Sequence, residues 1–294
     1  MRHGRRLFAL TFLVPPLLLY AIFVLSPYVQ AFQISATDWG GLSPDSNYVG
    51  LDNFSRLLHD HYVWNALKDN AILLVVLPVV TILLGLFFAS MLNVQGVRGS
   101  AIYRVVYFFP QVLSVAIIGV LWKEVYAPNS GLLNGVLRAV WLDSLAKPWL
   151  GDPDLAFWCV LAVMVWSNVG FYVVLFGAAM QSIPKDIYEA AVLDGTSDRQ
   201  MLMKITIPLL WDTIQVAWVY LAIAALDGFA LMQIITNGGP GFSSDVVGLR
   251  LYNTAFGESK FGYSSAIGVA MFFLTLSVAV VALRVTRRER IEHG

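Results

Sequence analysis

The sequence predicts an all-α integral membrane protein. Hydrophobic residues make up 58% of the 294 residues and charged residues only 13%, against roughly a quarter charged in soluble domains. The mean hydropathy is +0.69. Six apolar runs come close to or exceed the length of about 20 residues that a helix needs to cross a bilayer. They cover residues 7–28, 71–92, 105–122, 155–177, 213–235 and 264–283.

The first apolar run follows a basic segment and therefore has to be distinguished from a secretory signal peptide. It is longer than the apolar part of a typical signal peptide, it contains Pro15 and Pro16, and five more runs follow it. We expect it to remain in the protein as a membrane helix. We also expect all six spans to form one permease-like membrane domain over residues 1–294.

The distribution of Lys and Arg predicts that both termini are cytoplasmic. If the N-terminus is inside, the inside segments hold twelve of the 19 basic residues and the outside segments hold seven, although the outside segments are longer. An excess of basic residues on the cytoplasmic side is the rule for membrane proteins. The same orientation places the polar segment 182–208 in the cytoplasm.

The three outside loops are predicted to contain turns and short interfacial helices. The loop 30–64 holds His59 and His61 without a second cluster of ligands, so no metal site is expected there. In the loop 123–154, the apolar stretch 132–142 is too short to span a bilayer and favours an interfacial helix. The loop 237–263 opens with Asn-Gly-Gly-Pro-Gly, which should stop the fifth span abruptly.

The polar segment 182–208 predicts a helix, a sharp turn and a second helix. Pro184 suits the first position of a helix, and Gly195 suits its end because glycine adopts positive φ easily. Ser197 and Gln200 have the spacing of a capping box, so a second helix should start there and run toward Pro208. A small-residue surface on the first helix could lie against another protein, and the alternative is an amphipathic linker on the membrane surface.

This segment resembles the EAA loop of membrane subunits of binding-protein-dependent ABC importers. The resemblance rests on Glu-Ala-Ala at 189–191, Gly195 after three residues, and Ile-Thr-Ile-Pro at 205–208 after nine more. Ile207 replaces the usual Leu, a change that conserves volume. The resemblance implies a coupling helix that docks on an ATPase subunit. The implied coupling residues are Glu189, Ala190, Ala191, Asp194, Gly195, Ile205 and Pro208.

Further stretches are similar to carbohydrate permeases of the maltose and glycerol-3-phosphate type, in particular the type of the larger maltose permease subunit. They are residues 48–54, Phe109-Pro110 and residues 236–240. The resemblance implies a type I importer permease in a bacterial or archaeal cell membrane. It also implies a heterodimer with a second homologous permease, two ATPase subunits that bind ATP and Mg, an extracytoplasmic solute-binding protein, and a sugar as solute.

Other functions fit the sequence less well. The chain has no Gly-rich phosphate loop with a Lys, so it is expected to bind no cofactor itself and to hydrolyse no ATP. No catalytic constellation and no nucleic-acid partner are expected. Glycerol-3-phosphate or a polyol is the alternative solute. An ion-coupled secondary carrier is the alternative mechanism, and only Asp227 could serve as its ion site.

Asp227, in the fifth run, is the first candidate for the solute pathway. A charge inside a membrane span is costly and usually faces a cavity or a partner. Its place before the Gly-Gly-Pro turn resembles the place of sugar-binding residues in maltose-type permeases. Gly228 beside it would allow close approach of a ligand or of another backbone. The alternative is an ion pair between Asp227 and the partner permease.

The fourth run offers a second group of candidates. Asn168 and Tyr172 are four residues apart and share a helix face, and Trp166 lies nearby. Aromatic rings beside hydrogen-bonding side chains suit the apolar faces and hydroxyls of a sugar. The alternative is polar contact and aromatic packing between helices. Gln233 is a weaker candidate, and Cys159, in an apolar run, is expected to pack in the interior.

Overall fold

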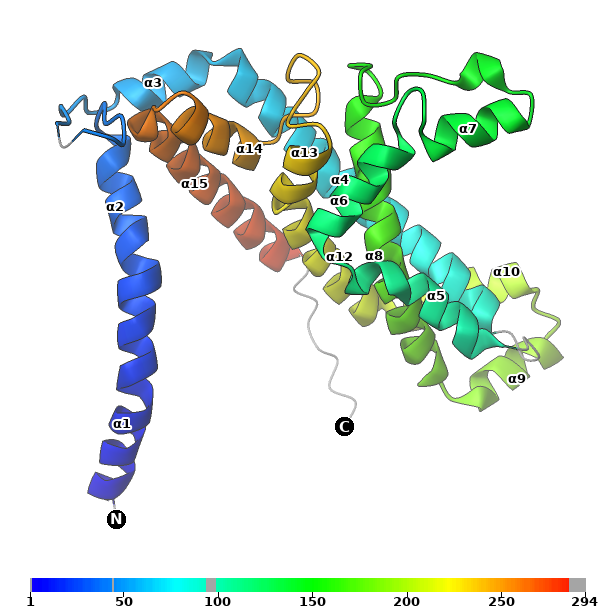
Figure 1. Cartoon of the computed structure of the whole chain (residues 1–294). Helices are drawn as coiled ribbons and strands as arrows, with labels where there is room; N and C mark the ends of the chain where they lie inside the picture. Colours follow the sequence, from blue (N-terminus) through cyan, green and yellow to red (C-terminus); the bar gives the residue numbers. More distant parts are fainter. Residues whose placement is uncertain (1, 44, 94–98, 286–294) are drawn as a thin grey trace. The chain divides into compact units, whose positions relative to one another are not determined.

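The computed structural model describes residues 2–43, 45–93 and 99–285, and these residues are largely helical (Figure 1). Outside the helices, the only strand-like pairing in these three ranges is one isolated bridge between Thr37 and Tyr48. The predicted all-α class is therefore confirmed. The chain packs as two compact units, Met1–Val63 with Arg250–Gly294, and Trp64–Leu249. A single domain over 1–294 stays a prediction.

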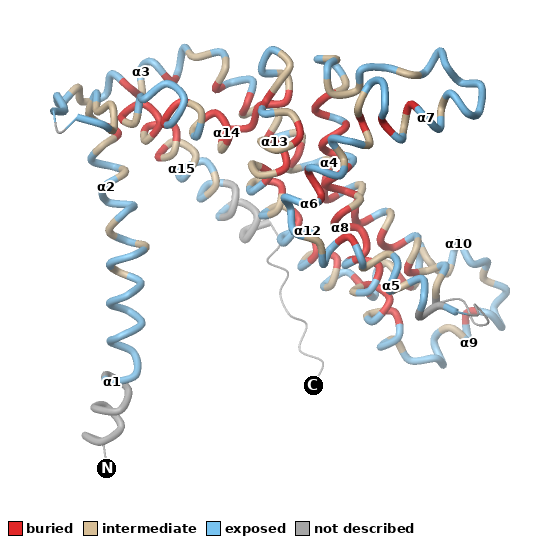
Figure 2. The backbone as a smooth tube through the Cα atoms, in the orientation of Figure 1, coloured by how far each residue is buried: buried red, intermediate tan, exposed pale blue. Residues whose placement is uncertain are grey.

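The first unit pairs an N-terminal helix with the last helix. Its elements are α1 (Arg2–Tyr20), a π-helical turn η1 (Ala21–Leu25), α2 (Ser26–Ser35), α3 (Asp52–His59), the end of α14 (Val247–Tyr252), a π-helical turn η4 (Asn253–Gly257) and α15 (Phe261–Val285). The helix α2 lies along α15, where the ring of Phe32 contacts Phe272 and Phe273 with centroids 6.0 and 5.9 Å away. Figure 2 shows α2 mostly exposed, as expected for an apolar helix that lipid or a partner covers.

The short helix expected in the first loop is α3, and a buried asparagine fixes it to the end of α2. The side-chain amide of Asn53 donates to the carbonyls of Ser35 at 2.9 Å and Thr37 at 2.8 Å. Gly262 at the start of α15 lies so close to the carbonyl oxygen of Thr37 that a Cβ would overlap it. These contacts fix the first outside loop to the end of α2 and to the start of α15.

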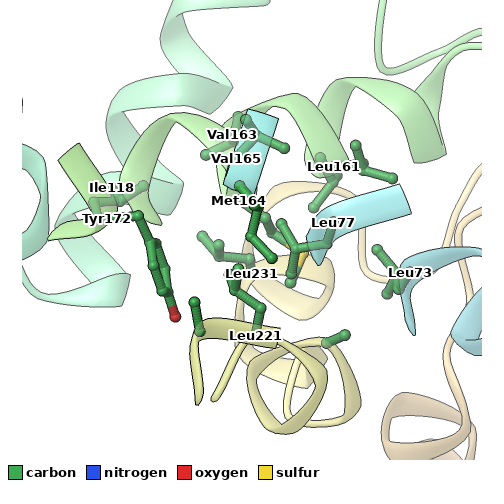
Figure 3. Close-up of a cluster of buried hydrophobic side chains, with 14 of the residues drawn as sticks. Leu73, Leu77, Ile118, Leu161, Val163, Met164, Val165, Tyr172, Leu221 and Leu231 are labelled. Carbon is green, nitrogen blue, oxygen red and sulfur yellow. The ribbon is translucent and has the colours of Figure 1, made fainter. Parts of the chain in front are cut away.

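The second unit is a bundle around α8, a buried apolar helix. Its elements are α4 (His61–Asn93), α5 (Ser100–Val112), α6 (Val115–Val125), α7 (Leu132–Ala139), a 3-10 turn η2 (Asp143–Leu145), α8 (Ala156–Gln181), α9 (Lys185–Leu193), α10 (Asp198–Met201), a π-helical turn η3 (Leu202–Thr206), α11 (Ile207–Leu209), α12 (Trp211–Leu226) and α13 (Phe229–Ile235). Leu73 and Leu77 of α4, Leu221 of α12 and Leu231 of α13 pack with α8 (Figure 3). Burial of such side chains, at about 25 cal/mol per Å² of apolar area, stabilises the unit.

Two predicted spans are broken, which corrects the prediction of continuous helices. The run 105–122 divides into α5 and α6, which are bent by 100°. Pro110 lacks a backbone donor, and Ser114 caps α6 by accepting the N–H of Ile117 at 3.4 Å. The run 213–235 stops at Leu226 and resumes at Phe229.

The described residues contain three helices that are long and apolar enough to cross a membrane. They are Thr11–Ser35, His61–Leu92 and Ala156–Gln181. Two bent pairs, Ile102–Val112 with Val115–Val125 and Asp198–Leu209 with Trp211–Leu226, raise the number to five if each pair is one span, and Phe261–Ser277 is a shorter apolar helix. Six spans and cytoplasmic termini are consistent with this count and stay predictions.

Candidate coupling segment and solute pathway

The segment 182–208 folds as the sequence predicts. Pro184 is the N-cap of α9, one residue earlier than expected, and Gly195 after α9 has φ of 73°. The predicted capping box is present: the Ser197 hydroxyl accepts the N–H of Gln200 at 3.4 Å, and the Gln200 side chain accepts the N–H of Ser197 at 3.2 Å. The second helix continues through α10, η3 and α11, past Pro208.

Most of the predicted coupling residues lie on the surface of this segment. Glu189, Ala190, Asp194, Gly195 and Pro208 are exposed, Ile205 is half-buried and Ala191 is buried. A hydrogen bond of 3.4 Å between the hydroxyls of Tyr188 and Thr206 holds α9 against η3.

Large apolar side chains are exposed beside these coupling residues. Leu193 is 88% exposed and Val192 62%. A charged residue, small residues and exposed apolar side chains on one short helix suit a protein partner, since a soluble surface rarely leaves such groups together uncovered.

The break between α12 and α13 places Asp227 at a helix end. Its N–H donates to the carbonyl of Ile223 at 3.0 Å, and its side chain is exposed. In the three described ranges, no hydrogen bond or ion pair holds its carboxylate. The carboxylate is therefore available to a ligand or to a partner subunit.

Gly228 is buried, and its lack of a side chain allows close helix packing. A Cβ there would stand 3.2 Å from Cε of Met164 on α8 and 3.5 Å from Cδ1 of Leu73 on α4. Met164 also accepts, through its carbonyl, a hydrogen bond of 2.8 Å from the side chain of Asn168. The structure therefore brings the Asp227 break next to α8, about one turn from Asn168.

The other candidates on α8 lie in apolar surroundings. Tyr172 is only 4% exposed and belongs to the buried apolar cluster (Figure 3), and its ring packs with Phe176 at a centroid distance of 6.2 Å. Its placement fits the packing alternative better than a sugar contact. Trp166 contacts Trp122 edge to face at 5.3 Å.

Trp166 also lines a groove of about 560 Å³ between α4, α5 and α8, together with apolar residues such as Phe88 and Pro110. The groove offers little to sugar hydroxyls, which need hydrogen-bond partners. The place of Trp166 in this apolar groove therefore does not by itself support a contact between Trp166 and a sugar.

Gln233 lies on α13, the half-helix that follows the Asp227 break. The buried residues of α13 are Leu231, Met232 and Ile235, and Gln233 lies away from them and is half-buried. Gly119 on α6 contacts Ile234 on α13, where a Cβ would stand 2.6 Å from Cγ2 of the Ile. The half-helices that follow the two breaks thus pack together, a relationship that the sequence analysis missed.

A family profile decides the identity of the chain. The profile of the binding-protein-dependent transport system inner membrane component matches residues 81–291. The chain belongs to this family. The match includes the coupling segment, the Asp227 break and α15, so the candidate sites lie within the family's common part.

Two curated relatives and one solved structure are similar over nearly the whole chain. The diacetylchitobiose uptake system permease protein NgcF of Streptomyces coelicolor is 42% identical over 98% of this chain and 84% of its own length. The multiple sugar-binding transport system permease protein MsmF of Streptococcus mutans is 32% identical over 95% of this chain and 94% of its own length. A bacterial transporter that imports alginate has a similar fold, with a TM-score of 0.84, 22% identity, and coverage of 98% and 97%.

Proposed function

We propose that this family member is the permease subunit of an ATP-driven importer of a sugar or oligosaccharide. The observation that carries the proposal is the coupling segment, since it combines the family's motif with an exposed, locally stabilised helix–turn–helix. Solute would pass by alternating access, with the site near the middle of the membrane.

The proposal includes partners that the single chain needs. An ATPase subunit, carrying ATP and Mg, would cover Glu189, Leu193 and their neighbours on α9. A second homologous permease would cover apolar helix surface such as Thr11–Ser35, whose most apolar window has no buried residue. An extracytoplasmic solute-binding protein would deliver the solute, and the alginate transporter has been crystallised in complex with a periplasmic protein.

The sugar class is supported by the names of the relatives and by the chemistry of Asp227. An ionised carboxylate accepts hydrogen bonds and donates none, so it suits a sugar hydroxyl. The same charge would repel glycerol-3-phosphate, whereas a neutral polyol remains the alternative solute. An ion-coupled carrier has no need of the exposed coupling segment and is therefore the less favoured mechanism.

The test is purification of the tagged chain from native membranes in mild detergent, followed by identification of stoichiometric partners. We expect a second permease and an ATPase, and we expect ATP hydrolysis that rises when a sugar-loaded binding protein is added. Transport by the chain alone, driven by an ion gradient, would contradict the proposal. Normal ATPase coupling with a non-sugar solute would contradict only the sugar class.

A further inference from the structure

The loop between α6 and α8, residues 126–155, carries an exposed apolar face that transport does not explain. Leu132 is 66% exposed and Trp141 is 90% exposed. The other large apolar residues of this face are Val136, Val140 and Leu142. An exposed patch of this kind marks contact with another apolar surface.

The apolar face has a fixed orientation, because the polar side of α7 is hydrogen-bonded to the rest of the loop. Asn134 is 1% exposed, and its side-chain amide donates to the carbonyls of Pro128 at 3.0 Å and Lys147 at 2.9 Å. Its side-chain oxygen accepts the indole N–H of Trp149 at 2.7 Å. All of its hydrogen-bonding groups are therefore used within the loop.

Arg138, one turn after Asn134, binds the same loop. Its guanidinium donates to the carbonyls of Asn129 at 3.1 Å and Pro128 at 3.3 Å. Leu132 and Val136, also four residues apart, lie on the opposite side of α7, given the helical repeat of 3.6 residues. The tethered polar side thus turns the apolar side outward.

The apolar side faces the direction in which α8 continues. In Figure 1, α7 runs across the direction of α8, beside the end where α8 begins, and the returning segment 143–150 lies above α7. The bond from Asn134 to Lys147 points the polar side of α7 at that segment. The 26 residues of α8 measure about 39 Å at 1.5 Å per residue, which exceeds a hydrocarbon core of about 30 Å. Because α8 can span the core and Asp152 and Asp154 directly precede it, the start of α8, and α7 beside it, belong at the height of the lipid headgroups.

We propose that α7 and Trp141 form an interfacial anchor in the lipid leaflet at this end of α8, with Leu132, Val136 and Trp141 in the acyl boundary. A helix with one apolar face lies in the plane of the membrane surface, and Trp is enriched at that depth. Residues 123–154 contain Lys123, Arg138 and Lys147 against Glu124, Asp143, Asp152 and Asp154. Because the charges nearly balance, the contact is apolar and needs no anionic lipid.

The anchor would hold the outer ends of two helices that border the Asp227 break. It joins α6, which packs on α13 through Gly119, to α8, which packs on Gly228 through Met164. The inference rests on the chain crossing a membrane and does not depend on which solute it carries.

The test measures the depth of spin labels on the whole transporter in phosphatidylcholine nanodiscs. With Cys159 replaced by Ala, single-cysteine variants Val136→Cys and Ser144→Cys are labelled, because Ser144 lies on the returning segment as a matched control. We expect oxygen, which concentrates in lipid, to relax the label at 136, and a water-soluble nickel chelate to relax the label at 144.

Two outcomes would overturn the anchor. Equal access of the nickel chelate to the labels at 136 and 144 would place the face in water. Access of neither reagent to 136 would show that protein covers it, whether the second permease or the binding protein. Leu132→Cys on the same face serves as the second position if Val136→Cys does not assemble, and the readout is independent of transport activity.

Discussion

Gly170 on α8 lies directly against the carbonyl oxygen of Tyr107 on α5, so that a methyl group on Gly170 would overlap it. The two helices therefore meet backbone to backbone, as small residues allow in membrane proteins. This contact fixes α5 on α8 next to the bend that starts α6.

Gly170→Ala is expected to destabilise the second unit. Overpacking of a tight contact costs about 1–3 kcal/mol, and here the neighbour is backbone, which cannot turn aside. The measurement is the midpoint of thermal unfolding in detergent. Gly135→Ala on α7 is the matched control, since a Cβ at Gly135 meets no atom within 4 Å and Ala favours a helix. Equal midpoints for the two variants would show that α5 and α8 can separate at little cost.

Asp60 and Tyr263 are expected to give the first unit a dependence on low pH. Desolvation raises the pKa of Asp60, but the hydrogen bond from the Tyr263 hydroxyl at 2.6 Å, the N–H of Tyr62 and the charge of Arg250 together lower it below 3.8. The folded state then binds fewer protons than the unfolded state. The stabilisation is thus complete above about pH 4 and is lost as pH falls through the lowered pKa.

Tyr263→Phe should remove part of this pH dependence while it keeps the ring under Arg56, whose Cζ lies 4.3 Å from the ring centroid. The loss is expected to be at most about 1.5 kcal/mol, because Asp60 is only partly buried. Unfolding midpoints measured between pH 3 and pH 7 test this, with Tyr48→Phe on the exposed loop as control. A pH profile of Tyr263→Phe identical to that of the unchanged protein would rule out a contribution from the hydrogen bond between Tyr263 and Asp60.

Glu189 and Gly195 are expected to serve coupling and not folding. Glu189→Lys should leave membrane insertion intact and abolish the ATP hydrolysis that solute stimulates. Gly195→Pro should have the same effect, because proline cannot adopt the left-handed backbone at φ of 73° that follows α9.

The control for Glu189→Lys is Asp186→Lys, which reverses an exposed charge on the same helix outside the motif. Stimulated ATP hydrolysis of the assembled transporter is the measurement, with the amount of co-purified ATPase as the check on assembly. If Glu189→Lys transported as well as Asp186→Lys, α9 would not be the docking element.

The orientation prediction can be tested with single cysteines after Cys159 has been replaced. A cysteine at Ser46 or Ser144 is expected to react with an impermeant thiol reagent in intact cells, or in spheroplasts where an outer barrier exists. A cysteine at Ser197 should react only after the membrane is opened. Labelling of Ser197 from outside would overturn the orientation and, with it, docking of a cytoplasmic ATPase.

Local rules were sufficient for the coupling segment but not for the helix breaks. Pro184, Gly195 and the Ser197–Gln200 box each act on residues within four positions, so the sequence predicted them, with Pro184 one position earlier in the helix than expected. The break at Ser114 follows a proline by four residues and could have been found from that cap. At the Asp227 break, Gly228 packs against Met164 and Leu73, which are far away in the sequence and cannot be paired with it by local rules.

The difference between local rules and contacts far apart in the sequence also explains why the sequence predicted the pathway candidates on α8 only in part. The spacing of Asn168 and Tyr172 correctly indicates one helix face, but spacing cannot tell what covers that face. Phe176 and the neighbouring helices cover Tyr172, and the side-chain amide of Asn168 already donates to the carbonyl of Met164. The carboxylate of Asp227, in contrast, has no partner in the described part of the chain and stays available.

Asp227 is therefore expected to accept a hydrogen bond from a hydroxyl of the transported sugar. Loss of one hydrogen bond to an ionised group costs about 1.5–3 kcal/mol, which is roughly a ten- to hundredfold loss of apparent affinity at the membrane site. Asp227→Asn should be milder than Asp227→Leu, because the amide oxygen still accepts. The measurement is the concentration dependence of uptake into vesicles that contain the whole transporter.

Two controls separate this role from an ion pair between the permease subunits. The affinity of the isolated binding protein for its sugar should be unchanged, since Asp227 is not part of that protein. Asp212→Leu, at an exposed acid in the first turn of α12, should leave uptake close to normal. If Asp227→Leu instead prevented the two permeases from associating, the carboxylate would pair with the partner, and the sugar-contact role would fall.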